Sequence, residues 1–333
     1  MNRAAGDQLR RTLVLAAVLL ALTSAAARSQ QAPLALEAKI PLGAVSGRID
    51  HMAIDLSRRR LIVAELGNGS IGVVDLTRRV VLRTLTGFDE PQGVGFLAAT
   101  DTIYVANGGD GSIRLFAAAD FKPLRTIALD SDADNVRGDE SAAQIYVGHG
   151  DGGIAVIDRA GSIVADIALP AHPESFQLDT GARRIYVNLP DADQVGVIDA
   201  AAGKRTGAWT MQGVRGNFPM ALDQANGRVV IGTRQPPRLL ALTMSGKIAA
   251  SAPLCGDADD IFIDAKRSRI YASCGEGMVD VFDSNAAMQR IGEMRTAPGA
   301  RTSLWVPMLD RLFVAVRASS GEPAAIWVLR PAP

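Results

Sequence analysis

The chain has 333 residues, with 35 Asp and Glu against 35 Lys and Arg, so its formal net charge at pH 7 is zero. This balance excludes a global electrostatic attraction to nucleic acid or to an anionic membrane surface. One long apolar run lies near the N-terminus, and no other run has the length needed to span a bilayer.

The first residues have the composition of an export signal. Three arginines precede a mostly apolar run over residues 12–22, which is short for a bilayer span, and small residues follow at 24–27. We therefore predict a signal peptide over residues 1–27 and a periplasmic or secreted mature protein. An uncleaved membrane anchor is the alternative.

A short motif, Ile103-Tyr-Val-Ala-Asn107, recurs in altered form through the rest of the chain. Successive copies begin 40 to 44 residues apart, which is the period of a propeller blade. The copies begin at Leu61, Ile103, Ile145, Ile185, Val229, Ile270 and Leu312. Seven copies predict an all-β protein, a seven-bladed β-propeller that forms a single domain over residues 34–331.

Each repeat contains four short β-prone runs, which predict a four-stranded antiparallel meander. The runs are apolar on both faces, as expected for sheets covered on both sides by neighbouring blades. The seventh repeat lacks a fourth run, whereas an unassigned run, Leu36–Leu42, precedes the first repeat. We expect this N-terminal segment to form the outer strand of the last blade and to close the ring.

Nine aspartates stand at the ends of the predicted strands. We expect their carboxylates to accept hydrogen bonds from turn amides, which explains the residue type without a functional role. They are Asp55, Asp139, Asp179, Asp223 and Asp264 after first runs, and Asp75, Asp158, Asp199 and Asp283 after third runs.

The repeated Ile-Tyr-Val-Ala/Asn motif is followed downstream by Gly-Ile-x-Val-Ile-Asp, as in Gly153–Asp158. Over nearly the whole predicted mature chain, this combination resembles the YVTN-type, YncE-like propeller family. The resemblance implies a seven-bladed propeller that is secreted or periplasmic. It implies no single activity, because propellers carry many functions. The Trp-Asp dipeptide of WD40 blades is missing, so that family is a poor match.

In a propeller, the segments that lead into the first strands meet at one mouth of the central channel, which we call the top face. The loops between second and third strands lie on the same face. All three histidines of the chain, His51, His149 and His172, map to it, and so do many acidic residues. The predicted ligand-binding residues are His51, Gln92, Asn135, His149, Glu174, Asn217, Asp260 and Arg301.

Oxygen ligands from several blades would converge at this mouth, which suits calcium, while the nearby histidines make zinc an alternative. The set Asn135, Glu174, Asn217 and Asp260 resembles, in composition only, the Glu, Asn and Asp metal cluster of gluconolactonase-type propellers. Those enzymes have six blades, and the residues do not match one by one. Without a bound cation, a cationic ligand or Arg301 beside them, carboxylates crowded at the mouth would raise one another's pKa.

Motifs for other chemistry are missing. The sequence contains no haem-attachment motif, no Gly-x-Ser-x-Gly nucleophile elbow and no phosphate-binding glycine loop before a helix. Two cysteines, Cys255 and Cys274, lie in the sixth repeat, where hairpin pairing is expected to set Cys274 opposite Asp260. Export permits a disulfide between them, and two free thiols near the mouth are the alternative.

The sequence favours a binding protein over an enzyme, with the acidic top mouth taking a small ligand, a metal or a protein partner. A metal-dependent hydrolase of the gluconolactonase kind is one alternative. A scaffold that meets an anionic partner through a basic lower rim is another, and in each case we expect a monomer. The basic residues predicted on that rim are Arg58, Arg59, Arg60, Arg78, Arg79, Arg183, Arg184, Lys266, Arg267 and Arg269.

Overall fold

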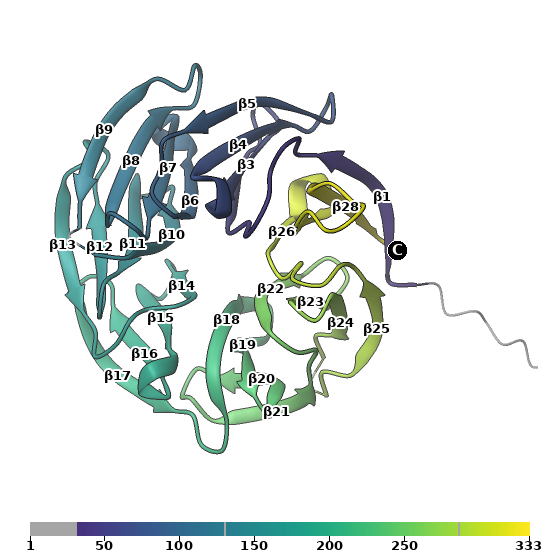
Figure 1. Ribbon diagram of the computed structural model, residues 1–333. Helices are drawn as coiled ribbons and strands as arrows, with labels where there is room; N and C mark the ends of the chain where they lie inside the picture. Colours follow the sequence, from purple (N-terminus) through teal and green to yellow (C-terminus); the bar gives the residue numbers. More distant parts are fainter. Residues whose placement is uncertain (1–31, 130, 286) are drawn as a thin grey trace, which may run out of the picture. The chain divides into compact units, whose positions relative to one another are not determined.

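The computed structural model describes residues 32–129, 131–285 and 287–333. Pro33–Pro333 forms one compact unit of seven four-stranded antiparallel sheets arranged as blades in a ring (Figure 1). The predicted seven-bladed β-propeller is therefore confirmed. The predicted signal peptide lies outside the described residues and stays a prediction.

In the first four blades, the strands follow one another in chain order from the channel outward. Blade 1 contains β2 (Met52–Asp55), β3 (Arg60–Glu65), β4 (Ser70–Asp75) and β5 (Val80–Thr86). Blade 2 contains β6 (Pro91–Leu97), β7 (Thr102–Asn107), β8 (Ser112–Ala117) and β9 (Pro123–Ala128). Blade 3 contains β10 (Ala133–Asp139), β11 (Gln144–His149), β12 (Gly153–Ile157) and β13 (Ile163–Ala168). Blade 4 contains β14 (Phe176–Asp179), β15 (Arg184–Leu189), β16 (Gln194–Asp199) and β17 (Lys204–Thr210).

The remaining blades have the same arrangement, with β1 as the outermost strand of the last. Blade 5 contains β18 (Arg215–Asp223), β19 (Arg228–Gln235), β20 (Pro237–Thr243) and β21 (Ile248–Pro253). Blade 6 contains β22 (Ala258–Asp264), β23 (Arg269–Cys274), β24 (Met278–Asp283) and β25 (Arg290–Arg295). Blade 7 contains β26 (Ser303–Val306), β27 (Arg311–Val316), β28 (Ala325–Pro331) and β1 (Leu34–Pro41). Single 3-10 turns occupy η1 (Leu66–Asn68), η2 (Ala98–Thr100), η3 (Pro190–Ala192), η4 (Gln224–Asn226) and η5 (Pro307–Leu309).

The N-terminal strand closes the ring as the sequence predicts. β1 pairs antiparallel with β28, so blade 7 combines the two ends of the propeller (Figure 1). Ile40 of β1 is 1% exposed and packs in one cluster with Phe313 of blade 7 and Leu61 of blade 1. The closing strand thus contributes to the apolar contact between the last blade and the first.

The hydrophobic core lies between the blades. Among the described residues, each of the seven buried clusters joins two neighbouring blades. The second strands are the most buried, because the Ile-Tyr-Val motif places apolar side chains on both faces; all six residues of β7 are buried. The outermost strands are mostly exposed, as β5 is.

All nine strand-end aspartates accept hydrogen bonds from turn amides, which confirms their structural role. Asp55 Oδ1 accepts from the Arg58 amide, for example, and Asp75 Oδ1 accepts from the Thr77 amide. The remaining seven are Asp139, Asp158, Asp179, Asp199, Asp223, Asp264 and Asp283.

Candidate functional site: the central channel and its mouth

The seven innermost strands surround a cavity of about 430 Å³. Its lining includes one residue from each blade at the equivalent position of the innermost strand. These residues are Ala53, Gly95, Arg137, Gln177, Ala221, Phe262 and Leu304. Arg137 is the only one of these seven that carries a charge, and the walls of the cavity as a whole combine apolar side chains with polar ones, among them His51 and Asp260.

Arg137 is held in place by the backbone around it. Its Nε donates to the carbonyl oxygen of Phe176 at 3.1 Å, and its Nη1 donates to that of Val136 at 2.9 Å. Its Nη2 donates to Asn135 Oδ1 at 3.2 Å, and the guanidinium lies 5.5 Å from the centre of the Phe176 ring. Of the residues that the structure describes, no carboxylate lies within 4.0 Å of this guanidinium. Burial lowers the pKa of Arg137, against the attraction of Asp260 and Asp134.

At the upper end of the cavity, His51 forms an ion pair with Asp134, with Nε2 and Oδ1 3.5 Å apart. Burial alone would lower the pKa of His51, but the hydrogen bond to Asp134 and the charges of Asp50, Asp134 and Asp260 outweigh burial and raise it to about 10. The imidazole is therefore an imidazolium at neutral pH. Burial would raise the pKa of Asp134, yet His51 holds it below its usual range.

Three other acidic side chains at the mouth have raised pKa values, in contrast to the lowered pKa of Asp134. Burial raises the pKa of Asp260 to about 7, even though its Oδ2 accepts a hydrogen bond from the Ser303 amide at 2.7 Å. Burial, with the charge of Asp134, raises the pKa of Glu174 to about 7. Burial also raises the pKa of Asp50 to about 6. Near neutral pH, Asp260 and Glu174 therefore each exist as a mixture of carboxylate and carboxylic acid.

Arginines stand between the aspartates of the acidic mouth. Arg301 pairs with Asp257 at 2.9 Å and with Asp259 at 3.1 Å, and Arg234 pairs with the same two residues at 3.2 Å and 2.7 Å. Arg48 pairs with Asp50 at 2.7 Å. Arg301 therefore supplies part of the compensation that crowded carboxylates require.

The top of the channel is narrow. A second cavity, of about 20 Å³, lies among Asp50, His51, Asp134, Asn135 and Glu174. That space is comparable to the volume needed for one water molecule. The sequence-predicted residues His51, Asn135, Glu174 and Asp260 thus meet at the upper end of the channel, around a constriction above the larger cavity.

The other predicted ligand residues lie elsewhere. Asn217 is fully buried, and its amide donates to Asn188 Oδ1 and to the Gln194 carbonyl oxygen, each at 2.9 Å. Gln92 donates to Asp132 at 2.8 Å. The ring of His149 contacts Asp166, on the outer strand of its own blade, at 3.0 Å. These side chains do not line the channel cavity.

Asn135 and Glu174 of the predicted metal set line the small cavity at the mouth, and the cation site stays a prediction. Asn217 contacts the neighbouring blade and does not meet Asn135 and Glu174 at the constriction. Within residues 32–129, 131–285 and 287–333, no group of three or more His, Cys, Asp or Glu side chains is arranged to hold a metal ion.

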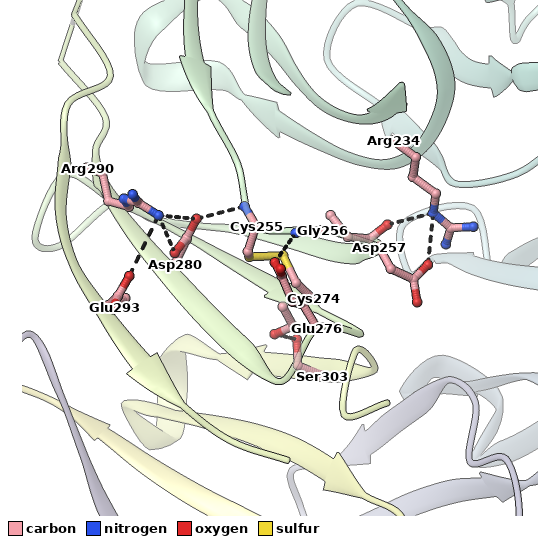
Figure 2. Close-up of a disulfide and its surroundings, with 12 residues drawn as sticks. Arg234, Cys255, Gly256, Asp257, Cys274, Glu276, Asp280, Arg290, Glu293 and Ser303 are labelled. Atoms are coloured by element: carbon pink, nitrogen blue, oxygen red, sulfur yellow. Dashed lines mark hydrogen bonds and ion pairs between the residues drawn. A yellow bond between two sulfur atoms is a disulfide. The ribbon is translucent and has the colours of Figure 1, made fainter. Parts of the chain in front are cut away.

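The two cysteines are joined in a disulfide beside the mouth (Figure 2). A register shift between Ala258 and Asp260 sets Cys274 opposite Ala258, which corrects the expected pairing with Asp260. Asp280, which is fully buried, accepts from the Cys255 amide at 3.0 Å and from Arg290 at 3.2 Å (Figure 2). The disulfide thus anchors the segment that carries the mouth aspartates at 257 and 259.

The basic residues predicted on the lower rim are largely occupied within the fold. Arg58 and Arg267 form ion pairs with aspartates of neighbouring blades, and Arg79 pairs with Glu37. Arg60 and Arg269 donate to backbone carbonyl oxygens. Many of these charges stabilise contacts within the propeller, so they give little support to a scaffold with a basic docking rim.

Comparisons with known proteins are informative on the fold. No family model matches the chain, and no curated protein matches it. The chain is similar to a solved structure titled Kuenenia stuttgartiensis hydrazine synthase, with 14% sequence identity and a TM-score of 0.75, covering 85% of this chain and 95% of that chain. The similarity supports the class, a seven-bladed β-propeller, while membership of the YVTN-type family stays a prediction. In the described part of the chain, no helix is long and apolar enough to cross a membrane.

Proposed function

We propose that this protein is a non-catalytic binding protein, exported to the periplasm or beyond, that holds a small amphipathic organic anion in its central channel. The observation that carries the proposal is Arg137, a partly buried arginine with no carboxylate within 4.0 Å of its guanidinium among the described residues, which lines a cavity with both apolar and polar walls. Ligand sites of this kind combine apolar surface with a few fixed polar groups. A volume of about 430 Å³ falls within their usual range.

The charges at the upper end of the cavity favour an anion. The imidazolium of His51 is paired with Asp134, whereas Arg137 has no carboxylate within 4.0 Å among the described residues. A ligand carboxylate would accept a charge-assisted hydrogen bond from Arg137 and restore the lost compensation. Asp260, with its pKa raised to about 7, is readily protonated and then adds a second donor instead of repulsion.

The apolar part of the ligand would lie along the cavity walls below Arg137. Ile54, Phe96, Leu222 and Ile263, each one position farther from the mouth than the level of Arg137, line the cavity and offer no hydrogen-bonding side chains. Burial of apolar surface there would contribute about 25 cal/mol for each Å² removed from water. A short monocarboxylate with a hydrocarbon chain matches both parts of the site.

Hexanoate and hexanamide form a matched pair of probes, because they share an apolar chain and differ in charge. We expect hexanoate, and not hexanamide, to raise the melting temperature of the protein, since a ligand that binds only the native state stabilises it by mass action. In an Arg137→Gln variant the hexanoate effect should disappear. Arg159, an exposed residue of a turn in blade 3, provides a control substitution, Arg159→Gln, that should leave it intact.

The comparison uses the shift in melting temperature with ligand, so any change in the basal stability of Arg137→Gln does not affect the result. Equal shifts with hexanoate in the wild type and in Arg137→Gln would contradict the proposal. Isothermal titration calorimetry of the same proteins would give the dissociation constants, and the charge-assisted hydrogen bond should account for at least about a tenfold difference.

A further inference from the structure

On the face opposite the mouth, neighbouring blades are joined by a repeated ion-pair arrangement, which we call the staple. In blade 1, Asp55 ends the innermost strand and Arg58 follows three residues later. Arg58 Nη1 donates to Asp55 Oδ2 at 2.9 Å. The same guanidinium donates to both carboxylate oxygens of Asp101 in blade 2, at 2.6 Å and 2.8 Å. One arginine thus bridges two aspartates on adjacent blades.

The same staple joins blades 6 and 7. Arg267 Nη1 donates to Asp264 Oδ2 at 3.0 Å, and its two Nη atoms donate to Asp310 at 2.7 Å each. The hydroxyl of Tyr271 also donates to Asp264 Oδ2, at 2.7 Å. The second oxygen of the strand-end aspartate therefore has two donors in this staple.

The junction of blades 3 and 4 has the strand-end aspartate and lacks the rest of the staple. Asp139 is equivalent to Asp55 and Asp264, but Ala142 stands where they have arginine. On blade 4, Arg183 has the left-handed backbone conformation that Asp101 and Asp310 have in their turns. The bridging cation is therefore missing, and the partner on the next blade has the opposite charge.

A cavity of about 420 Å³ occupies this junction. Asp139 and Asp179 line it with Arg183 and Arg184, and the hydrophobic side chains of Leu178 and Ile185 complete its wall. The volume is within the range of small-molecule sites. The pocket thus lies at the position that the staple occupies between blades 1 and 2 and between blades 6 and 7.

The charged groups of this cavity have unused bonding capacity. Each aspartate accepts turn hydrogen bonds through Oδ1, from the Ser141 and Ala142 amides in one case and the Ala182 amide in the other. Within the described residues, Oδ2 of Asp139 and of Asp179 accepts no hydrogen bond, and no carboxylate lies within 4.0 Å of Arg183 or Arg184. Two open carboxylate oxygens and two guanidiniums without ion pairs therefore face one pocket.

We propose that the junction of blades 3 and 4 is a binding site for an arginine ligand, whose guanidinium pairs with Asp139 and whose α-carboxylate pairs with Arg183. The ligand guanidinium pairs with the strand-end aspartate, as Arg58 and Arg267 do in the intact staples. The ligand carboxylate compensates the charge of Arg183, which stands where the staples have an aspartate. Both free arginine and the C-terminal arginine of a peptide carry these two groups. This site is separate from the central channel.

Three small molecules test the two ends of the ligand by isothermal titration calorimetry. L-Arginine should bind, and agmatine, which lacks the carboxylate, should bind at least about tenfold more weakly, because each charge-assisted hydrogen bond contributes about 1.5–3 kcal/mol. N-acetyl-L-arginine distinguishes the two sources: binding equal to that of L-arginine indicates a peptide C-terminus, and much weaker binding indicates the free amino acid. Equal binding of agmatine and L-arginine would overturn the role of Arg183, and no binding of L-arginine would overturn the site.

The double variant Ala142→Arg with Arg183→Asp rebuilds the staple sequence at this junction. It should melt at a higher temperature than the wild type and should no longer bind L-arginine, because its own guanidinium fills the site. Arg159→Asp makes the same change of charge as Arg183→Asp at an exposed turn of blade 3, and it should leave L-arginine binding unchanged. Undiminished binding by the double variant, with a native circular dichroism spectrum, would overturn the proposal.

Discussion

Arg267 and Asp310 lie on adjacent blades and are joined by two parallel hydrogen bonds of 2.7 Å. The arginine side chain is 10% exposed, and it also pairs with Asp264 of its own blade. The hydrogen bond from Arg267 holds the pKa of Asp310 at about 2. We expect the pair to stabilise the fold more than an exposed surface ion pair does, because the guanidinium is partly buried and binds the carboxylate through two atoms.

We expect Arg267→Gln to lower the free energy of unfolding by about 1–3 kcal/mol, because it leaves Asp264 and Asp310 without their shared cation. Urea unfolding measured by circular dichroism would give the value. Arg159→Gln is the control and should change it by less than about 0.5 kcal/mol, as is usual for exposed sites. An Arg267→Gln variant as stable as this control would show that the bridge contributes nothing to the contact between blades 6 and 7.

The architecture is largely readable from the sequence because it depends on short-range patterns that repeat. The Ile-Tyr-Val motif specifies a strand buried on both faces, and its spacing specifies the number of blades. The seventh repeat lacks a fourth strand and an unassigned strand precedes the first repeat, which together predict closure by the N-terminal strand. The pairing of β1 with β28 confirms it. The contacts of the turn aspartates are equally local, since each carboxylate accepts hydrogen bonds from amides two to four residues away.

The site is harder to predict, because the direction of a side chain near the mouth depends on irregular register. A register shift within β18, between Asn217 and Met220, accompanies the contact of Asn217 with blade 4. Arg137 was not among the predicted ligand residues. One sequence signal could have identified it: among the residues at the equivalent position of the seven innermost strands, it is the only one that carries a charge.

The sequence indicates the charge balance of the mouth only in part, by offering Arg301 as one of three groups that could offset the carboxylates. Arg234 lies near the end of β19, and Arg301 comes from the segment before β26, yet both pair with Asp257 and Asp259 of blade 6. Such pairs join residues more than 20 positions apart, and no local pattern indicates them.

The disulfide leads to a second prediction. Cys255 and Cys274 are 19 residues apart, and closing a loop of this size restricts the unfolded chain by about 3 kcal/mol. The double substitution Cys255→Ser with Cys274→Ser should lower the free energy of unfolding by about that amount, measured by urea denaturation without reductant. Titration of thiols in unfolded, unreduced wild type should find none, and two free thiols per chain would refute the disulfide.

The third prediction concerns the acidic side chains at the mouth. Burial raises the pKa of both Asp260 and Glu174 to about 7, well above the value of about 4 expected in an unfolded chain. Between about pH 4 and pH 7 the native state therefore binds more protons than the unfolded state. The contribution of these two groups to stability therefore falls as the pH rises through this window, because ionising these side chains in the native state is costly.

Glu174→Gln with Asp260→Asn removes both titrating groups and keeps an oxygen that can accept from the Ser303 amide. This variant should lose less stability than the wild type between pH 4 and pH 7, and at pH 7 it should be the more stable of the two. His51 titrates mainly above this window, because its pKa is raised to about 10, and its contribution to stability is lost between about pH 6.5 and pH 10. Urea unfolding at pH 4, 5, 6 and 7 measures the slopes, and parallel slopes for the two proteins would contradict the prediction.

The same pair of proteins tests the cation site expected from the sequence, because calcium or zinc bound at these carboxylates would stabilise the wild type at pH 7 and the variant much less.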